Sequence, residues 1–329
     1  MKFFFTYKPV STSFGGGNQF VLNLSKYLIN KNHRVVYDLN HNDIDIIIVI
    51  DPRRLRYNKY DTNSVIKYKQ KHPNVKIIHR VNECDIKREK SIGIEAKLLK
   101  VFRIADCIVF VSRWLLNYYV KKYKLFPIIN KMKVVINGCN INHFNPNKEK
   151  LIINRENGNY DINQLLKNRP IRLVTHHWSD NLLKGFDVYN YLDQEMGKRK
   201  DFVFTYIGNY NKNYQPKNLR LLPPMNGTQL ADELRNHDIY ITGTRNEPGA
   251  MHYLEGGSCG LPVVYHSGGG GALEVCSKFG EVYSNTNELW KKIDKIKNSY
   301  NDYLKKIDYQ WLGSIRCCEE WDTILESLR

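Results

Sequence analysis

Residues 242–274 read TGTRNEPGAMHYLEGGSCGLPVVYHSGGGGALE. This stretch holds two glutamates, Glu247 and Glu255, eight positions apart, with a Pro-Gly pair between them and four consecutive glycines behind them. The apolar residues 239–243 predict a buried strand before it, and a helix is expected to begin at Pro248 or the next residue. Free amides at a helix start bind anions, whereas nearby carboxylates need hydroxyls or cations. We therefore expect either a site for a phosphorylated sugar or, as the simpler alternative, two surface acids on a helix.

The rest of the chain alternates short apolar runs with amphipathic segments. Strands are expected at residues 2–7, 34–39, 45–51, 75–81, 107–111, 133–137, 171–177, 202–208, 219–223, 239–243 and 262–266. Between them, apolar residues recur at helical spacing in segments 18–33, 63–72, up to 103, 113–123, 185–196, 228–236, 250–259 and 288–297. This order is typical of an α/β fold with doubly wound parallel sheets that are covered on both faces.

One polar segment, residues 145–170, interrupts this alternation and separates two Rossmann-like domains. We expect an N-terminal domain at 1–165, a C-terminal domain at 166–302, and a helical tail at 303–329 that packs back on the N-terminal domain. Ligands of open parallel sheets bind at the carboxyl ends of the strands. The predicted site therefore lies in a cleft across which the two sheets face each other.

Composition restricts the function classes but leaves the partner open. The 329 residues include 50 Lys and Arg against 33 acids, a formal charge of +17. That charge favours an anionic partner, such as nucleic acid, a phospholipid surface or a phosphorylated small molecule, although the abundance of Asn, Ile, Lys and Tyr could alone account for the lysines. The seven cysteines are scattered without zinc-ligand spacing, so we expect reduced thiols. No signal peptide or membrane-spanning run is apparent, which predicts a cytoplasmic protein, with peripheral membrane contact as an option.

The stretch 247–264 resembles the signature of glycosyltransferase family 4, and of family 1-like relatives, which have the GT-B fold. The matching residues are Glu247, Glu255, Gly260, Pro262, Val263 and Val264. Five further segments are similar to the family in the expected order, namely 14–28, 107–114, 134–146, 176–188 and 268–275. Within 134–146, Asn140 stands where an aspartate is usual. The resemblance covers essentially the whole chain.

The resemblance implies a retaining transferase that moves a sugar from a nucleotide-diphosphate sugar, with UDP or GDP as the expected nucleotide, to a glycan, lipid-linked or other hydroxyl acceptor. No metal and no cofactor are implied, because cationic side chains and a helix end offset the phosphate charge. Glu255 would bind the ribose hydroxyls, Glu247 the donor sugar, and Lys184 the diphosphate. The other donor-binding residues implied are Gly15, Gly16, Gly17, Asn209, Ala250, Met251 and His252.

A polar loop after the strand at 75–81 is the expected acceptor side. Its residues are His79 and Arg80 at the end of the strand, and Asn82, Glu83 and Asp85 behind them. The resemblance suggests that the first two also act in catalysis by touching the donor sugar. The alternative is a capped loop with a solvated charge cluster.

The loop before Lys184 departs from the family. Relatives often carry Gly-Arg about five residues before the lysine, whereas this chain has Trp178 and Ser179. Arg245, Arg80 or a histidine could substitute.

Several other functions remain as alternatives. A related GT-B enzyme, such as a nucleotide-sugar epimerase or a pyridoxal-dependent phosphorylase, would use a similar cleft. A non-catalytic protein could use its basic, aromatic helix at 113–123 on nucleic acid or an anionic membrane, although specific nucleic-acid binding is not expected. Asp43 and Asp45 suit a metal, but they precede a buried strand and are expected to cap it.

Overall fold

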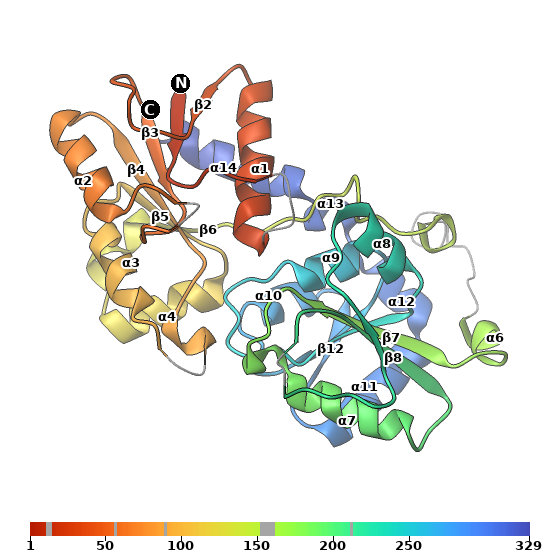
Figure 1. Ribbon diagram of the computed structural model, residues 1–329. Helices are drawn as coiled ribbons and strands as arrows, with labels where there is room; N and C mark the ends of the chain where they lie inside the picture. The colour runs from red at the N-terminus through yellow and green to blue at the C-terminus, as the bar shows by residue number, and fades with distance from the viewer. Residues whose placement is uncertain (11–14, 56–57, 89–90, 152–161, 211–212) are drawn as a thin grey trace. The chain divides into compact units, whose positions relative to one another are not determined.

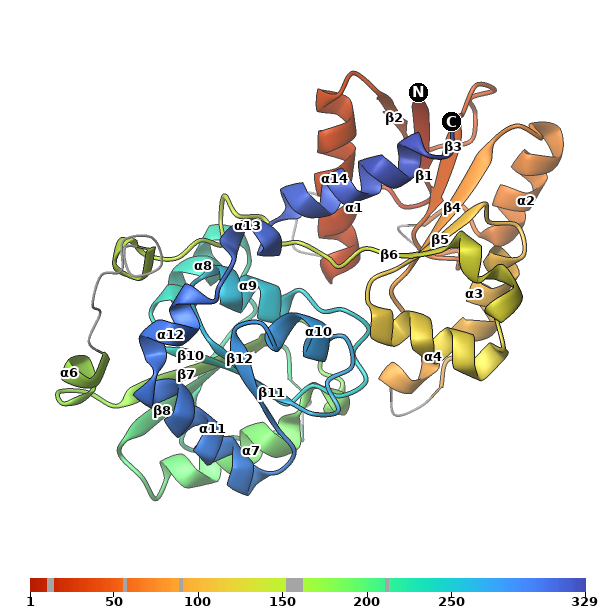
Figure 2. The same cartoon turned by 180° about the vertical axis from the view of Figure 1, so that it is seen from behind.

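The computed structural model describes residues 1–10, 15–55, 58–88, 91–151, 162–210 and 213–329. Its contacts divide the chain into two compact units. The first unit comprises Met1–Ile86, Lys90–Asn137 and Ser314–Arg329, and the second comprises Lys87–Glu89 and Gly138–Gly313. Figures 1 and 2 show the elements of each unit from two sides.

The division falls before the boundary expected at 165, because the segment after Gly138 packs on the second unit. Lys150 is buried there, and its ammonium donates to the carbonyl of His237 at 3.0 Å. Cys139 Sγ likewise lies 2.9 Å from Ser258 Oγ. The polar composition of 145–170 hid these contacts.

The first unit contains a six-stranded parallel sheet in the order β2-β1-β3-β4-β5-β6. Its strands are β1 (Lys2–Phe5), β2 (Arg34–Val36), β3 (Ile46–Val49), β4 (Lys76–Val81), β5 (Cys107–Phe110) and β6 (Met132–Val134). Its helices are α1 (Gly15–Asn30), α2 (Thr62–Lys71), η1 (Asp85–Lys87), α3 (Ile94–Phe102), α4 (Arg113–Tyr123), η2 (Phe126–Lys131) and α14 (Ser314–Glu326).

Alternating strand residues form one core on each face of this sheet. Phe4 packs with α2, α3 and α4, whereas Phe3 and Phe5 pack with α1 and α14. On the second face, the ring of Trp321 in α14 lies 5.0 Å from the ring of Phe20 in α1. The C-terminal helix therefore belongs to the first unit, and α1 and α14 lie together in both views (Figures 1 and 2).

The second unit contains another six-stranded parallel sheet, in the order β12-β11-β10-β7-β8-β9. Its strands are β7 (Ile171–His177), β8 (Phe202–Gly208), β9 (Arg220–Leu222), β10 (Ile239–Thr242), β11 (Val263–His266) and β12 (Gly280–Tyr283). Its helices are α6 (Ile162–Leu166), η3 (Leu182–Lys184), α7 (Phe186–Met196), α8 (Gly227–Arg235), α9 (His252–Ser258), α10 (Ala272–Cys276), α11 (Thr286–Asn298), α12 (Tyr300–Lys305) and α13 (Tyr309–Leu312).

The two parallel sheets confirm the predicted fold class, while their placement across a cleft stays a prediction. Read from β9, the second sheet has the order of the dinucleotide-binding Rossmann fold, with a switch between β7 and β10. Such a switch opens a crevice at the carboxyl ends of the two strands. Lys184 and Glu247 lie in the loops that leave those ends. Within the described ranges, no helix combines the length and apolar character needed to cross a bilayer.

Candidate functional site

Glu247 lies in the loop after β10 and is paired with two lysines. Its carboxylate forms an ion pair with the ammonium of Lys184, and the Nζ atom of Lys87 lies 3.3 Å from Oε1. Glu247 is only 4 % exposed. Burial by itself would raise the pKa of Glu247, but the charges of Lys184 and Lys87 outweigh it and lower that pKa well below its usual range. The site therefore holds a buried carboxylate at neutral pH, flanked by two cations.

Lys87 is a site residue that the sequence did not indicate. It follows the loop expected on the acceptor side, yet it clusters with the second unit. Its carbonyl accepts a hydrogen bond of 2.9 Å from the Asn181 side chain, in the loop that precedes Lys184. A single lysine in a polar stretch gives no pattern by which it could have been found.

The glycine run at 268–271 holds the backbone of Glu247. Gly271 donates its amide to the carbonyl of Glu247 at 2.8 Å. Gly270 has a φ of +67°, and a Cβ atom there would lie 2.5 Å from the same carbonyl oxygen. Asn246, with a φ of 52°, donates its amide to the Gly268 carbonyl. Only glycine at 270 allows this close approach.

Helix α9 begins at His252, later than the expected start at Pro248. The amide of Ala250 donates to the Tyr253 hydroxyl at 3.0 Å, so that amide is not available to a ligand in this structure. Met251 stands at the N-cap, and the amide of Glu255 donates to its carbonyl at 2.9 Å. The anion site expected from three successive amides is therefore reduced to those of Met251 and His252.

Glu255 lies in α9 and is bound by a histidine from β7. The Nε2 atom of His176 lies 2.8 Å from Oε2 of Glu255. The carboxylate remains partly open, with 14 % of the Glu255 side chain exposed. Across the described residues, no hydrogen bond to Oε1 is formed, which leaves an acceptor for a ligand hydroxyl.

Three histidines pack beneath these acids. The hydroxyl of Tyr240 in β10 lies 3.1 Å from His176 Nδ1 and 3.2 Å from His252 Nδ1. The ring of His177 lies 4.7 Å from that of His252. Burial lowers the pKa of His177 and of His252 well below the usual value, and the nearby Lys184 adds to the effect. The two neighbouring histidines at the end of the strand at 171–177 were the only signal of this cluster in the sequence.

Arg245, a candidate to assist Lys184, and Asn209, a predicted donor-binding residue, are both engaged in other contacts. Arg245 donates to both oxygens of Asp187, at 2.9 and 2.6 Å. The side-chain amide of Asn209 donates to the Trp178 carbonyl at 2.6 Å. In this structure, Lys87 rather than Arg245 supplies the second positive charge beside Glu247.

In the first unit, His79 and Arg80 are buried within β4. His79 is 0 % exposed, and its ring packs against that of Phe102 at 5.5 Å. Arg80 donates to the Asn137 side chain at 3.0 Å and lies over the Phe20 ring at 4.2 Å. Burial lowers the pKa of His79 to about 3 and that of Arg80 to about 10. Both side chains are buried in this structure, and their expected contact with the donor sugar stays a prediction.

The remaining acceptor-side residues form local structure. Asp85 accepts the amides of Ile92 and Ile94, at 3.2 and 3.0 Å, and so caps the start of α3. These contacts agree, for Asp85, with the alternative of a capped loop that the sequence left open beside acceptor binding. Glu83 accepts a hydrogen bond from the Tyr119 hydroxyl through its backbone carbonyl, and Asn82 is half-buried.

The glycines Gly15, Gly16 and Gly17 form the first turn of α1, at the switch between β1 and β3. Gly15 has a φ of 69°. The segment 11–14 before them lies outside the described residues. Their expected contact with a donor stays a prediction.

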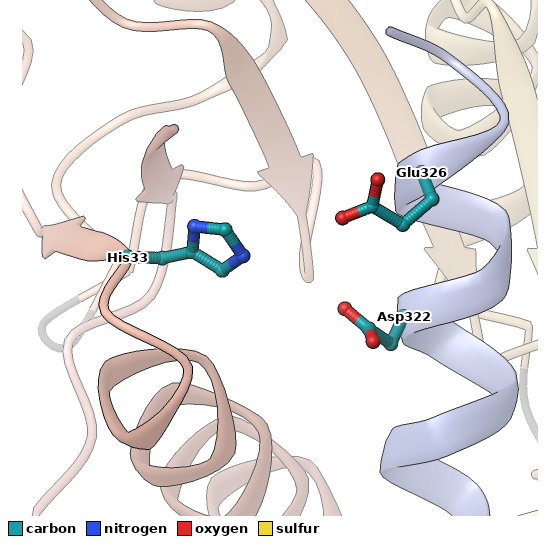
Figure 3. A group of neighbouring side chains, drawn as sticks. All are labelled: His33, Asp322 and Glu326. Carbon is teal, nitrogen blue, oxygen red and sulfur yellow. The ribbon is translucent and has the colours of Figure 1, made fainter.

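One group of potential metal ligands occurs in the described ranges, far from these acids in sequence. His33 faces Asp322 and Glu326 of α14, and the ligand atoms lie within 4.8 Å of one another (Figure 3). Each carboxylate already has a cation: Lys31 lies 2.5 Å from Asp322, and Arg329 lies 2.7 Å from Glu326. The pair of Lys31 and Asp322 joins the turn after α1 to α14, and the pair of Arg329 and Glu326 lies at the end of α14.

The aspartates before β3 are likewise structural. Asp43 pairs with the ammonium of Lys2, and Asp45 accepts the Lys2 amide at 2.6 Å. Both contacts join the segment before β3 to Lys2 of β1.

Comparison with known proteins supports the fold. No family model and no curated protein sequence matches the chain. Among solved structures, sucrose-phosphate synthase from Thermosynechococcus elongatus aligns with 99% of this chain and 98% of its own at 12% identity and a TM-score of 0.66. A glycosyltransferase from Rickettsia africae aligns with 99% of this chain and 98% of its own, at 15% identity and a TM-score of 0.64. HepE from Anabaena, solved in complex with UDP-glucose, aligns with 99% of this chain and 100% of its own, at 11% identity and a TM-score of 0.64. The chain thus has the GT-B fold of these proteins.

Proposed function

We propose that this protein is a glycosyltransferase that uses a nucleotide-diphosphate sugar as donor. The observation that carries the proposal is the pair Glu247 and Glu255 at the switch point of a GT-B second sheet, beside Lys184. Two carboxylates suit the hydroxyls of a ribose and of a sugar, and the lysine suits the diphosphate between them. The similar HepE structure contains UDP-glucose, which supports the same class of donor.

The roles follow from the positions of the groups. Glu255 would accept ribose hydroxyls through Oε1 while His176 holds Oε2. Lys184 and Lys87 would share their charge between Glu247 and the diphosphate, so that the leaving phosphate is stabilised without a metal ion. Glu247 would accept a hydroxyl of the transferred sugar. No side chain in this arrangement is needed as a nucleophile, which fits retention through front-side attack.

The acceptor is proposed only by class. A glycan, a lipid-linked sugar or another hydroxyl compound would suit the reaction, and the formal charge of +17 suits an acceptor on an anionic surface. Peripheral contact with such a membrane belongs to the same proposal.

The experiment is a donor hydrolysis and transfer assay with UDP-, GDP-, dTDP- and ADP-glucose, with EDTA and with added Mg²⁺. We expect release of one nucleotide diphosphate in EDTA, with the anomeric configuration of the donor retained in the product. Glu247→Gln should abolish release, while the control Glu326→Gln in α14 of the first unit should not. Equal release by wild type and Glu247→Gln would refute the proposal.

A further inference from the structure

Beneath the two acids, four side chains form one continuous hydrogen-bonded chain. It runs from Glu255 to His176 at 2.8 Å, from His176 to the Tyr240 hydroxyl at 3.1 Å, and from that hydroxyl to His252 at 3.2 Å. The chain ends at Nε2 of His252, which is buried and has no hydrogen-bond partner among the described residues. A buried polar atom without a partner is costly to the fold, which suggests that a ligand completes it.

The direction of the hydrogens along this chain can be assigned. An ionised carboxylate only accepts, so Nε2 of His176 carries a hydrogen. The Tyr240 hydroxyl accepts the backbone amide of His176 at 3.0 Å, and its own hydrogen is directed to His176, at the carbonyl or at Nδ1. Having spent that hydrogen, it accepts from Nδ1–H of His252. Nε2 of a neutral His252 is then a bare lone pair.

The surroundings of His252 decide between a neutral and a charged ring. The groups that face it are His176 and Tyr240, the ring of His177, the ring of Tyr253 at 5.0 Å, and the pair formed by Lys184 and Glu247. Burial and the positive charge of Lys184 disfavour protonation, and the carboxylate of Glu247 only partly opposes them. The ring is neutral at physiological pH.

A neutral acceptor nitrogen repels phosphate oxygens, which are acceptors too, and binds a hydroxyl. We propose that His252 is a specificity-determining residue whose Nε2 accepts a hydrogen bond from a hydroxyl of the transferred sugar. This inference rests on the proposed function, because it concerns the sugar of the same donor. The family resemblance placed His252 among the donor-binding residues, and this inference assigns the contact to its side chain.

The first test is the tautomer, which does not require any ligand. Nitrogen NMR of the full chain labelled with ¹⁵N-histidine, assigned by the loss of one signal set in His252→Phe, distinguishes the two ring nitrogens. We expect hydrogen on Nδ1 of His252 and on Nε2 of His176 between pH 6 and 8. A hydrogen on Nε2 of His252, in either the neutral or the charged ring, would overturn the inference. Tyr240→Phe should leave His252 as a mixture of tautomers.

The second test separates the sugar from the nucleotide. Calorimetry would compare the four nucleotide-glucoses with their free diphosphates. His252→Phe should weaken binding of the nucleotide-sugar about 3- to 10-fold, as expected for one neutral hydrogen bond, and change binding of the free diphosphate by less than about 2-fold. The control is His237→Phe, a buried histidine of the same unit whose ring nitrogens contact the Glu233 carbonyl and Thr205.

The outcomes are distinct. Equal weakening of sugar and diphosphate, or no weakening of either, would overturn the role of His252 while the proposed function stands. Binding of the diphosphate but of no nucleotide-sugar by wild type would overturn the role as well. Failure of wild type to bind any of these compounds, with the predicted tautomer present, would overturn the proposed function and the sugar contact together.

Discussion

The Nε2 atom of His176 lies 2.8 Å from Oε2 of Glu255 and joins the end of β7 to helix α9. The contact fixes the rotamer of the carboxylate on which the ribose is proposed to bind. Because Glu255 is proposed to contact the ligand and His176 to act only through Glu255, the two substitutions should differ in the size of their effect on binding. Glu255→Ala should weaken binding of the free nucleotide diphosphate about 10- to 100-fold, the range of hydrogen bonds to a charged group. His176→Phe should weaken it less, which calorimetry would show.

The ion pair between Lys184 and Glu247 predicts a stability effect as well as a binding effect. Lys184→Met leaves a buried carboxylate with only Lys87 beside it. We expect a loss of about 3 kcal/mol in the free energy of unfolding, because the buried carboxylate of Glu247 loses one of its two cations. Urea denaturation at pH 7 measures it. The exposed pair of Arg199 and Asp201 is the control, and Arg199→Met should cost less than about 1 kcal/mol.

Acid should weaken the wild-type fold through Glu247. Its pKa in the folded protein is depressed, so the unfolded chain takes up a proton first as the pH falls. The stability that Glu247 contributes is therefore complete above the usual carboxyl pKa of about 4.3 and is lost below it. Denaturation midpoints between pH 6 and 3 should fall more steeply for wild type than for Glu247→Gln. Parallel curves would contradict this assignment.

His79 predicts a second pH effect in a different range. Its pKa falls from the usual 6.5 to about 3 because the ring is buried, so only the unfolded chain binds a proton between these values. Stability should thus decrease as the pH falls from about 6.5 towards 3. His79→Leu removes the effect. The melting temperature of His79→Leu minus that of wild type should be more positive at pH 5 than at pH 8. The same difference at both pH values would contradict a neutral buried ring.

The glycine run predicts a matched pair of substitutions. Gly270 and Gly93 have φ angles of +67° and +64°, but only at Gly270 would a Cβ atom meet the backbone of Glu247, whereas none lies within 4 Å at Gly93. Gly93→Ala should cost about 1–2 kcal/mol for its left-handed backbone alone. Gly270→Ala should lower the free energy of unfolding by about 1–3 kcal/mol more than Gly93→Ala does. It should also reduce nucleotide-sugar binding. Equal costs in thermal denaturation would show that the glycines do not hold the Glu247 loop.

The sequence predicted the two sheets because parallel strands buried on both faces appear as short apolar runs, such as 46–50. It indicated Glu247 and Lys184 through the family resemblance, and the ion pair between them agrees with a shared site. It did not predict Lys87, whose position depends on a tertiary contact with Asn181. It placed His79 in a ligand site because a strand residue that points into the core looks the same in sequence as one at the strand end.

The helix start at His252 was misjudged for a local reason. Pro248 and Gly249 suit a first helical turn, but the Ala250 amide is taken by the Tyr253 hydroxyl and the loop continues to Met251. Side-chain competition of this kind is not visible in the spacing of apolar residues. The same holds for Arg245, whose partner Asp187 lies 58 positions away.

The central claim is that a nucleotide-diphosphate sugar binds at Glu247 and Glu255. The most direct measurement is the melting temperature of the full chain with UDP-, GDP-, dTDP- and ADP-glucose, each in EDTA and in Mg²⁺. A donor at 100 times its Kd should stabilise the fold by about 2.7 kcal/mol. We predict a rise with one nucleotide, present in EDTA and lost in Glu255→Ala. A chain that melts at the same temperature with all four donors, or a rise that Glu255→Ala retains in full, would contradict the claim.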